Sequence, residues 1–308
     1  MTSSTLRIVT RESPLAMWQA NFVRGALSCL HPALKIEVLG ITTEADRLLD
    51  SSLESLGGKG AFVKELEQAL ISGHADIAVH SMKDVSIELP KDLILPVVLK
   101  REDARDVFVS NQFDKFSDLP VNARIGTSSL RRTCQLKSKQ ANFQVLDIRG
   151  NVGTRLRKLD EGQYDALVLA AAGVKRLGLE NRIKQYFSPE SLLPAVSQGA
   201  LGIEIHEQNS EILELIKPLT DDDTHLCVKA ERALNRRLGG DCHVPIAAYA
   251  QINNAQLSMD SLVGRLDGSQ LIKASLSGPA NEAEIIGDKL GRILLHKGAG
   301  KILQELKK

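Results

Sequence analysis

Hydrophobic positions recur along this chain with two periods, and their alternation predicts a mixed α/β fold. Short apolar runs predict buried strands, and apolar residues spaced three and four apart predict helices. Strands are predicted at 6–10, 35–42, 76–80, 93–100, 107–110, 124–127, 144–148, 166–170 and 202–205. Helices are predicted between several of them, for example at 13–31, where Ser13 precedes Pro14 as an N-cap. Strand–helix–strand order favours right-handed crossovers and parallel pairing.

The same pattern divides the chain into three parts. The strand–helix order restarts at Arg124, and the strand at 202–205 returns the chain to the first sheet. Beyond a helix at 221–238, alternating strands at 246–252, 256–265 and 271–277 precede an amphipathic helix at 282–296. We therefore expect two doubly wound α/β domains (1–99 with 200–217, and 100–199) and a small α+β domain with a three-stranded antiparallel sheet (218–308).

Composition indicates a globular protein and narrows its ligands. The chain has 308 residues, 43% of them hydrophobic, which excludes disorder and fibre. Its 39 Lys and Arg nearly balance 38 Asp and Glu, but residues 122–182 hold twelve basic residues against five acidic ones. Such an excess suits an anion site or a solvated basic face. Only 4% of residues are aromatic, and none alternate with these arginines, so we expect no nucleic acid partner.

The cysteines and the apolar runs indicate in which cellular compartment the protein is expected. Cys29, Cys134, Cys227 and Cys242 are scattered without CxxC spacing, which favours reduced thiols in the cytoplasm and no metal site. No apolar stretch typical of a signal peptide follows Met1, and the longest apolar run, 166–174, is about half the length of a membrane span. We expect a cytoplasmic protein without a membrane segment.

Three helix N-termini each combine free backbone N–H groups with hydroxyls and arginines. These N-termini lie at Ser13, at 127–129 and at 150–154. Backbone donors and guanidinium groups are what carboxylates and phosphates require, and these residues do not choose between the two anions. Ordinary helix capping is the alternative for any one turn. The arginines beside the turns are Arg11, Arg131, Arg132, Arg149 and Arg155.

Two further groups could carry chemistry. Asp84 follows a predicted buried strand and has Ser81 and Lys83 beside it, where a carboxylate can exchange protons or stabilise a cation, or can form a surface ion pair. Cys242 lies between Gly239-Gly240-Asp241 and His243, in a loop between a helix and a strand. A small buried hydrophobe and an exposed thiol used for covalent attachment are the two interpretations.

With these motifs in place, the chain resembles the porphobilinogen deaminases, also called hydroxymethylbilane synthases. The matching stretches are 10–16 (TRESPLA), 57–65 (GGKGAFVKE), 76–85 (DIAVHSMKDV), 126–132 (GTSSLRR), 147–156 (DIRGNVGTRL), 167–179 (LVLAAAGVKRLGL), 193–202 (LPAVSQGALG) and 231–247 (ERALNRRLGGDCHVPIA). They follow one another from end to end in the family's order. The resemblance implies two domains like type II periplasmic binding proteins and a small third domain.

The resemblance also implies an activity. Family members carry a dipyrromethane cofactor in thioether linkage to the loop thiol, which here is Cys242. Porphobilinogen loses ammonia to give an electrophilic azafulvene, which the growing chain attacks. Four units are added head to tail, and hydrolysis releases linear hydroxymethylbilane in tetrapyrrole biosynthesis. Such a transferase is expected to act as a monomer.

Residue roles follow from the same resemblance. Asp84 matches the catalytic carboxylate, and Lys59 and Phe62 lie in the mobile loop over the cleft. Asp241 departs from the family, which usually has Gly immediately before the cysteine; a carboxylate there disfavours the thiolate. The residues implied to bind the acidic arms of cofactor and substrate are Arg11, Ser13, Ser81, Lys83, Thr127, Ser129, Arg131, Arg132, Arg149, Arg155 and Arg176.

Two other classes of function remain to be weighed. A non-catalytic protein could close two domains on a small dicarboxylate, but Asp84 and Cys242 would then be idle. A nucleic-acid-binding regulator using the basic domain would show steep salt dependence. The transferase accounts for more of these residues than either alternative.

Overall fold

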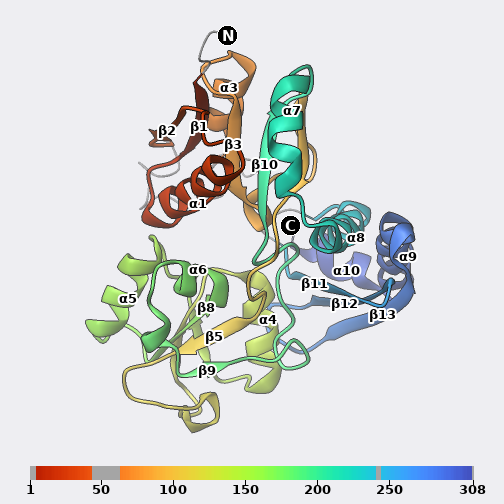
Figure 1. Ribbon diagram of the computed structural model, residues 1–308. Helices are drawn as coiled ribbons and strands as arrows, with labels where there is room; N and C mark the ends of the chain where they lie inside the picture. Colours follow the sequence, from red (N-terminus) through yellow and green to blue (C-terminus); the bar gives the residue numbers. More distant parts are fainter. Residues whose placement is uncertain (1–4, 44–62, 241–243, 307–308) are drawn as a thin grey trace. The chain divides into compact units, whose positions relative to one another are not determined.

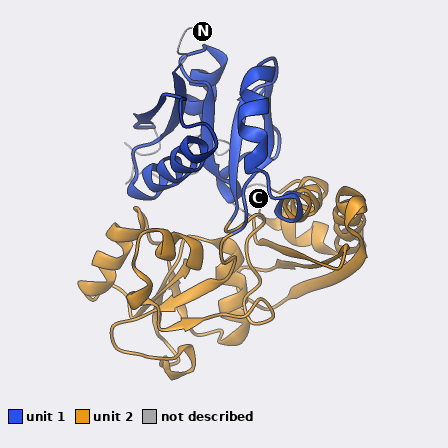
Figure 2. Ribbon diagram, in the orientation of Figure 1, with its two compact units in different colours: residues 1–101, 200–225 blue, residues 102–199, 226–308 orange. Residues whose placement is uncertain are grey.

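Two compact units make up the protein in the computed structural model, which describes residues 5–43, 63–240 and 244–306. The first unit contains residues 1–101 and 200–225, and the second contains residues 102–199 and 226–308 (Figure 2). The first unit is therefore formed from two separate parts of the chain.

The first unit is built on a five-stranded mixed sheet in the order β2-β1-β3-β10-β4. Figure 1 labels β2, β1, β3 and β10 of this sheet. Strands β1 and β2 are parallel, as are β1 and β3, whereas β10 runs antiparallel to both β3 and β4. The strands are β1 (Leu6–Arg11), β2 (Ile36–Ile41), β3 (Ile77–Ser81), β4 (Leu93–Val98) and β10 (Leu201–His206), and the helices α1 (Pro14–Leu30), α3 (Lys64–Ile71) and α7 (Ser210–Ile216).

Among the described residues, two apolar cores lie against this sheet. Val23 and Leu27 of α1 pack with alternate residues of β1 and β3, such as Ile8. Leu66 and Leu70 of α3 pack in a separate core with the intervening residues of β1 and β3, such as Val9. Since successive residues of a strand point to opposite faces, α1 and α3 cover opposite sides of the sheet. The sheet is thus doubly wound, and its loops are left at the strand ends.

The second unit contains a sheet of matching design, with strand order β7-β6-β8-β5-β9. Strand β6 is parallel to both β7 and β8, whereas β5 is antiparallel to β8. Apolar cores around Phe108 and around Val107 lie on its two faces. The elements are β5 (Asp106–Val109), β6 (Arg124–Gly126), β7 (Gln144–Leu146), β8 (Ala166–Ala170), β9 (Gln185–Tyr186), α4 (Leu130–Lys139), α5 (Val152–Asp160) and α6 (Ala171–Arg176).

The same unit ends in a three-stranded antiparallel sheet, β11-β12-β13. A large apolar core lies between one face of this sheet and the helices that precede and follow the sheet in the chain. Cys134 of α4 packs with Ala247 and Leu262 of this sheet, where burial raises the pKa of its thiol to about 12 and makes it unreactive. The elements are α8 (Asp222–Leu238), β11 (Ile246–Asn253), β12 (Gln256–Gly264), β13 (Leu271–Pro279), α9 (Ala283–His296) and α10 (Ala299–Glu305).

The expected fold class is confirmed: α/β, with two doubly wound sheets and a small C-terminal antiparallel sheet. The sheets are mixed, because each includes a strand that enters from the opposite direction. The short helices α6, α7 and α10 were not predicted, since each is too short to show a clear period. In the part of the chain that the structure describes, no helix combines the length and the hydropathy needed to cross a membrane.

Candidate functional site

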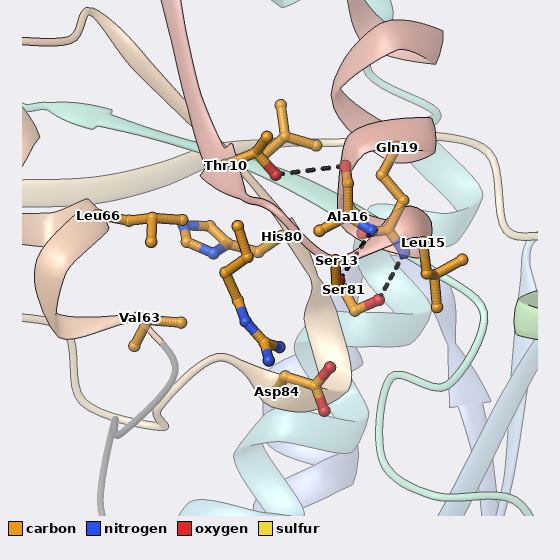
Figure 3. Close-up of a pocket in the computed structure, with 12 residues that line it drawn as sticks. Thr10, Ser13, Leu15, Ala16, Gln19, Val63, Leu66, His80, Ser81 and Asp84 are labelled. Carbon is orange, nitrogen blue, oxygen red and sulfur yellow. Dashed lines mark hydrogen bonds between the residues drawn. The ribbon is translucent and has the colours of Figure 1, made fainter. Parts of the chain in front are cut away.

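A pocket of about 420 Å³, including its open mouth, lies in the first unit at the carboxyl ends of β1 and β3 (Figure 3). Open α/β sheets bind ligands at this edge because the strand-to-helix loops gather there. The polar wall of the pocket comes from the predicted site residues Arg11, Ser13, Ser81 and Asp84, and from Thr10, Gln19 and His80, which sequence patterns did not single out.

Local structure explains how these side chains are presented. Ser13 caps α1 by accepting a hydrogen bond from the Ala16 N–H at 3.3 Å. The Gln19 side chain donates to Ser81 Oγ at 2.8 Å, which links α1 to the end of β3 (Figure 3). A short 3₁₀ turn, η1 (Met82–Asp84), then places Asp84 in an exposed position at the pocket. Lys83 lies in the same turn and is also exposed.

Below the pocket, three ionisable side chains come from three different elements. His80 of β3 and Glu204 of β10 are 5% and 1% exposed, and His80 Nε2 lies 2.9 Å from Glu204 Oε2. Glu67 of α3 is 9% exposed. The pKa of Glu67 is raised to about 7, mainly by burial and also by the charge of Glu204, and His80 partly offsets the rise. Of the three, Glu67 is therefore the carboxyl group that burial leaves partly protonated near neutral pH.

Glu67→Gln is expected to make the protein less sensitive to rising pH. Below pH 4.5 the carboxyl is protonated in both folded and unfolded chains; between pH 4.5 and 7 only the unfolded chain releases its proton, which favours unfolding as the pH rises. Relative to wild type, the variant should therefore gain about 3 kcal/mol in free energy of unfolding over this window. Urea denaturation at pH 4.5 and pH 8 measures the difference.

Glu37→Gln is the matched control, because Glu37 is half exposed and pairs with Lys35 on the surface of the same unit. It should leave the pH dependence unchanged. Equal stability differences between Glu67→Gln and wild type at both pH values would contradict the buried-acid assignment.

In the second unit, the predicted basic residues collect at the carboxyl ends of β6, β7 and β8. Because these strands run parallel, their ends meet at one edge of the sheet. Ser129 caps α4 by position without a side-chain hydrogen bond, and Thr127 Oγ1 instead accepts the Ser129 N–H at 3.2 Å. Asn151 caps α5 by accepting the Thr154 N–H at 2.9 Å.

Arg131 and Arg132 form the most buried part of this edge. They are 3% and 6% exposed, and both bind Asp106, which is fully buried at the start of β5. Burial alone would raise the pKa of Asp106, but the two guanidinium charges outweigh it and hold the pKa well below its usual range. One carboxylate therefore faces two cations, leaving an excess positive charge. Among the described residues, the Nε atoms of both arginines have no hydrogen-bond partner.

A tight turn at 195–199 supports these arginines. Gln198 Nε2 donates to Asp106 Oδ1 at 2.8 Å and to the Ala104 carbonyl at 2.7 Å. Ser197, at a positive φ of 60°, donates its N–H at 2.5 Å to Glu231, which also accepts the N–H of Ala250 at 2.8 Å. The turn is thus tied to α8 and β11.

The remaining arginines of the edge are each held by a nearby oxygen. Arg149 Nε donates to Asp147 at 2.8 Å, and Arg155 Nε donates to the Gly150 carbonyl at 2.8 Å. Arg176 donates to the Gly199 carbonyl at 2.7 Å, and burial lowers its pKa to about 10. Held in this way, the guanidinium groups have restricted orientations before any ligand binds.

The structure thus brings four predicted residues to one pocket in the first unit and seven to one sheet edge in the second. Cys242, Asp241, Lys59 and Phe62 lie outside the described residues. Sequence patterns missed Asp106 because a single acid at the start of an apolar strand resembles an ordinary boundary residue. Gln198 and Glu204 gave no local signal, since their partners lie far away in the chain.

Comparison with known proteins agrees with this architecture. The family model described as "Porphobilinogen deaminase, dipyromethane cofactor binding domain" matches residues 6–214, and "Porphobilinogen deaminase, C-terminal domain" matches residues 225–296. Fold and site define an α/β protein with a dipyrromethane-cofactor-binding domain and with basic residues at the carboxyl edges of its two doubly wound sheets. The chain belongs to the porphobilinogen deaminase family. It is a transferase that forms hydroxymethylbilane from porphobilinogen and uses a dipyrromethane cofactor.

Solved structures of binding proteins show limited similarity. A periplasmic substrate-binding protein of an ABC transporter from Coxiella burnetii is 12% identical, with 70% of this chain and 91% of that chain covered and a TM-score of 0.45. The periplasmic aliphatic sulphonate binding protein from Escherichia coli is 14% identical, with 75% and 70% covered and a TM-score of 0.42. At these values the similarity says nothing about what this chain binds.

The residues present fit the dipyrromethane. Its acetate and propionate arms are carboxylates, and the edge of the second unit offers excess positive charge and two buried guanidinium Nε atoms without described partners. Bidentate guanidinium groups match carboxylate geometry. Arg131 and Arg132 are therefore suited to hold acidic arms.

Proposed function

We propose that the chain joins four porphobilinogen units head to tail, with release of ammonia, into linear hydroxymethylbilane. The observation that supports the residue assignments best is the pair of buried arginines, Arg131 and Arg132, which share one carboxylate. A catalyst that handles molecules with several carboxylate arms requires such fixed cations. A non-catalytic dicarboxylate-binding protein would need the cations but no carboxylate at the reacting centre.

Asp84 is assigned the catalytic role in this proposal. Its carboxylate stands at the mouth of a pocket whose walls include Arg11 and Ser13. A fixed anion stabilises positive charge where that charge develops on the substrate as ammonia leaves. Arg11, in the pocket wall, and Lys83, next to Asp84 in the turn, are assigned as cations for the acidic arms, and Ser13 and Ser81 as hydroxyl donors.

The second unit is assigned the binding of further acidic arms. Its donors are Thr127, Ser129, Arg131, Arg132, Arg149, Arg155 and Arg176. Bound through the thiol of Cys242, the dipyrromethane would supply the primer that is extended. Lys59 and Phe62 belong to the proposal on the resemblance alone.

The domain division is part of the same proposal. We assign residues 1–99 with 200–217 to the first domain, 100–199 to the second and 218–308 to the third. Supporting this division, the cores of the two sheets in the second unit are largely separate, apart from the small cluster around Cys134. We further propose a cytoplasmic monomer that binds no nucleic acid.

Intact-mass measurement tests the attachment. Protein from native expression should be heavier than its sequence by two pyrrole units, and Cys242→Ser should fold but have the unmodified mass and no turnover. Cys29→Ser is the control, because Cys29 is an exposed free thiol; it should keep the adduct. An unmodified wild-type chain would contradict the function, and an adduct on Cys242→Ser would contradict the attachment site.

A further inference from the structure

His80 occupies a position in the pocket wall that the assigned roles do not explain. It is the penultimate residue of β3, lines the same pocket as Asp84 and Arg11, and is 5% exposed. Figure 3 shows its ring turned toward Leu66 of α3. Nε2 contacts Glu204, so Nδ1 is the ring nitrogen that this contact does not use. An apolar residue would fill this space without burying a polar ring.

Glu204 holds the ring in the manner of a carboxylate that supports a catalytic imidazole. Glu204 Oε2 lies 2.9 Å from His80 Nε2. The other carboxylate oxygen, Oε1, has no hydrogen-bond partner among the described residues. A buried carboxylate with an unused oxygen is strongly stabilised when its neighbour becomes a cation. Such a partner fixes the orientation of an imidazole and favours its protonation.

Among the residues that the structure describes, few other charged groups lie around His80. Glu67 faces it from α3, Glu204 from β10, and Arg11 and Asp84 line the pocket after β1 and β3. From α1 the pocket wall receives Gln19, which does not titrate. Two buried acids therefore lie behind the ring, and the pKa of one of them is raised to about 7.

We propose that His80, oriented by Glu204 and backed by Glu67, accepts the proton released at each condensation. The inference rests on the proposed function. Porphobilinogen enters with an ammonium group; the carbon–nitrogen bond breaks, and its electron pair leaves with ammonia. The ring carbon that forms the new carbon–carbon bond loses one proton to the imidazole, which passes it to the ammonia, so that ammonium is the net product.

Physical chemistry favours this division of labour with Asp84. A base works best when its pKa lies near the working pH, and imidazole is the side chain that changes charge there. Asp84 is exposed and can remain an anion that stabilises positive charge. The His80 imidazolium would be stabilised by Glu204 and, above neutral pH, by ionised Glu67 as well.

The test compares His80→Gln, Glu204→Gln and wild-type holoenzyme, with His74→Gln as control because His74 is exposed in the same unit. Initial rates with porphobilinogen are measured from pH 5.5 to pH 9, after intact mass has confirmed equal cofactor loading. His80→Gln should lower kcat about 100-fold or more with KM changed less than about threefold, and should remove one ionisation from the pH profile. His74→Gln should match wild type.

A second readout does not depend on turnover. In protein labelled with ¹⁵N-histidine, the His80 ring signals should change between pH 5 and pH 9, and Glu67→Gln should alter that change. Ring signals that stay unchanged over this range would overturn the proposal even if the variants failed to fold. Near-normal kcat in folded His80→Gln would also overturn it, whereas a wild type without turnover or adduct would instead overturn the proposed function.

Discussion

Replacing Asp84 by Asn is expected to lower kcat by about 10²- to 10³-fold while KM changes less than about threefold. Asn keeps the size and hydrogen-bonding capacity of the side chain but removes its charge. The acidic arms of the substrate would still bind to the arginines, so the loss should appear in the chemical step. Steady-state rates of porphobilinogen consumption measure both constants.

Glu88→Gln is the matched control for this variant. Glu88 is an exposed carboxylate four residues further along the chain, and it does not line the pocket as described. The control should keep both constants near their wild-type values. A porphobilinogen assay in which Asp84→Asn runs at near-normal rates would refute the catalytic assignment.

Asp106→Asn is expected to destabilise the protein by about 3–5 kcal/mol. The fully buried carboxylate compensates Arg131 and Arg132, and removing its charge leaves two buried cations that repel each other. Gln198 would also lose an ionised acceptor. Urea denaturation measures the stability, and KM for porphobilinogen in the remaining folded protein should rise, because the arginines lose their fixed positions.

Asp103→Asn provides the comparison on the same segment. Asp103 binds Arg105 in a partly exposed pair, so its loss should cost less than about 1 kcal/mol. If both variants lost equal stability, the buried charge network would not be the cause.

The arginine cluster illustrates how far sequence patterns reach. Arg131 and Arg132 were placed correctly near a helix N-terminus, because the strand-turn-helix order is a local property. Their burial and their shared partner were not predicted, because Asp106 lies 25 residues earlier in the chain and Gln198 lies more than 60 residues later. Long-range contacts of this kind leave no spacing to detect.

The pocket in the first unit shows the same difference between local and long-range contacts. Ser13 and Asp84 could be predicted because a cap and a strand end are visible in a few neighbouring residues. His80 was within a predicted strand, but its partner Glu204 is 124 residues away and enters on a strand of opposite direction. The family resemblance implied residue roles that local patterns left open. The described structure adds two buried carboxylates, Asp106 and Glu204, that contact basic side chains of the site.

The crossing strand β10 also constrains how the protein is made. It pairs with both β3 and β4, which precede it by about a hundred residues. Until residues 201–206 have been synthesised, the edge of β3 that pairs with β10 is therefore open, and β4 lacks its neighbour in the sheet. Strand pairing over so long a loop is slow, because its closure entropy must be overcome first. The sheet of the first unit can therefore be completed only after β10 has been synthesised.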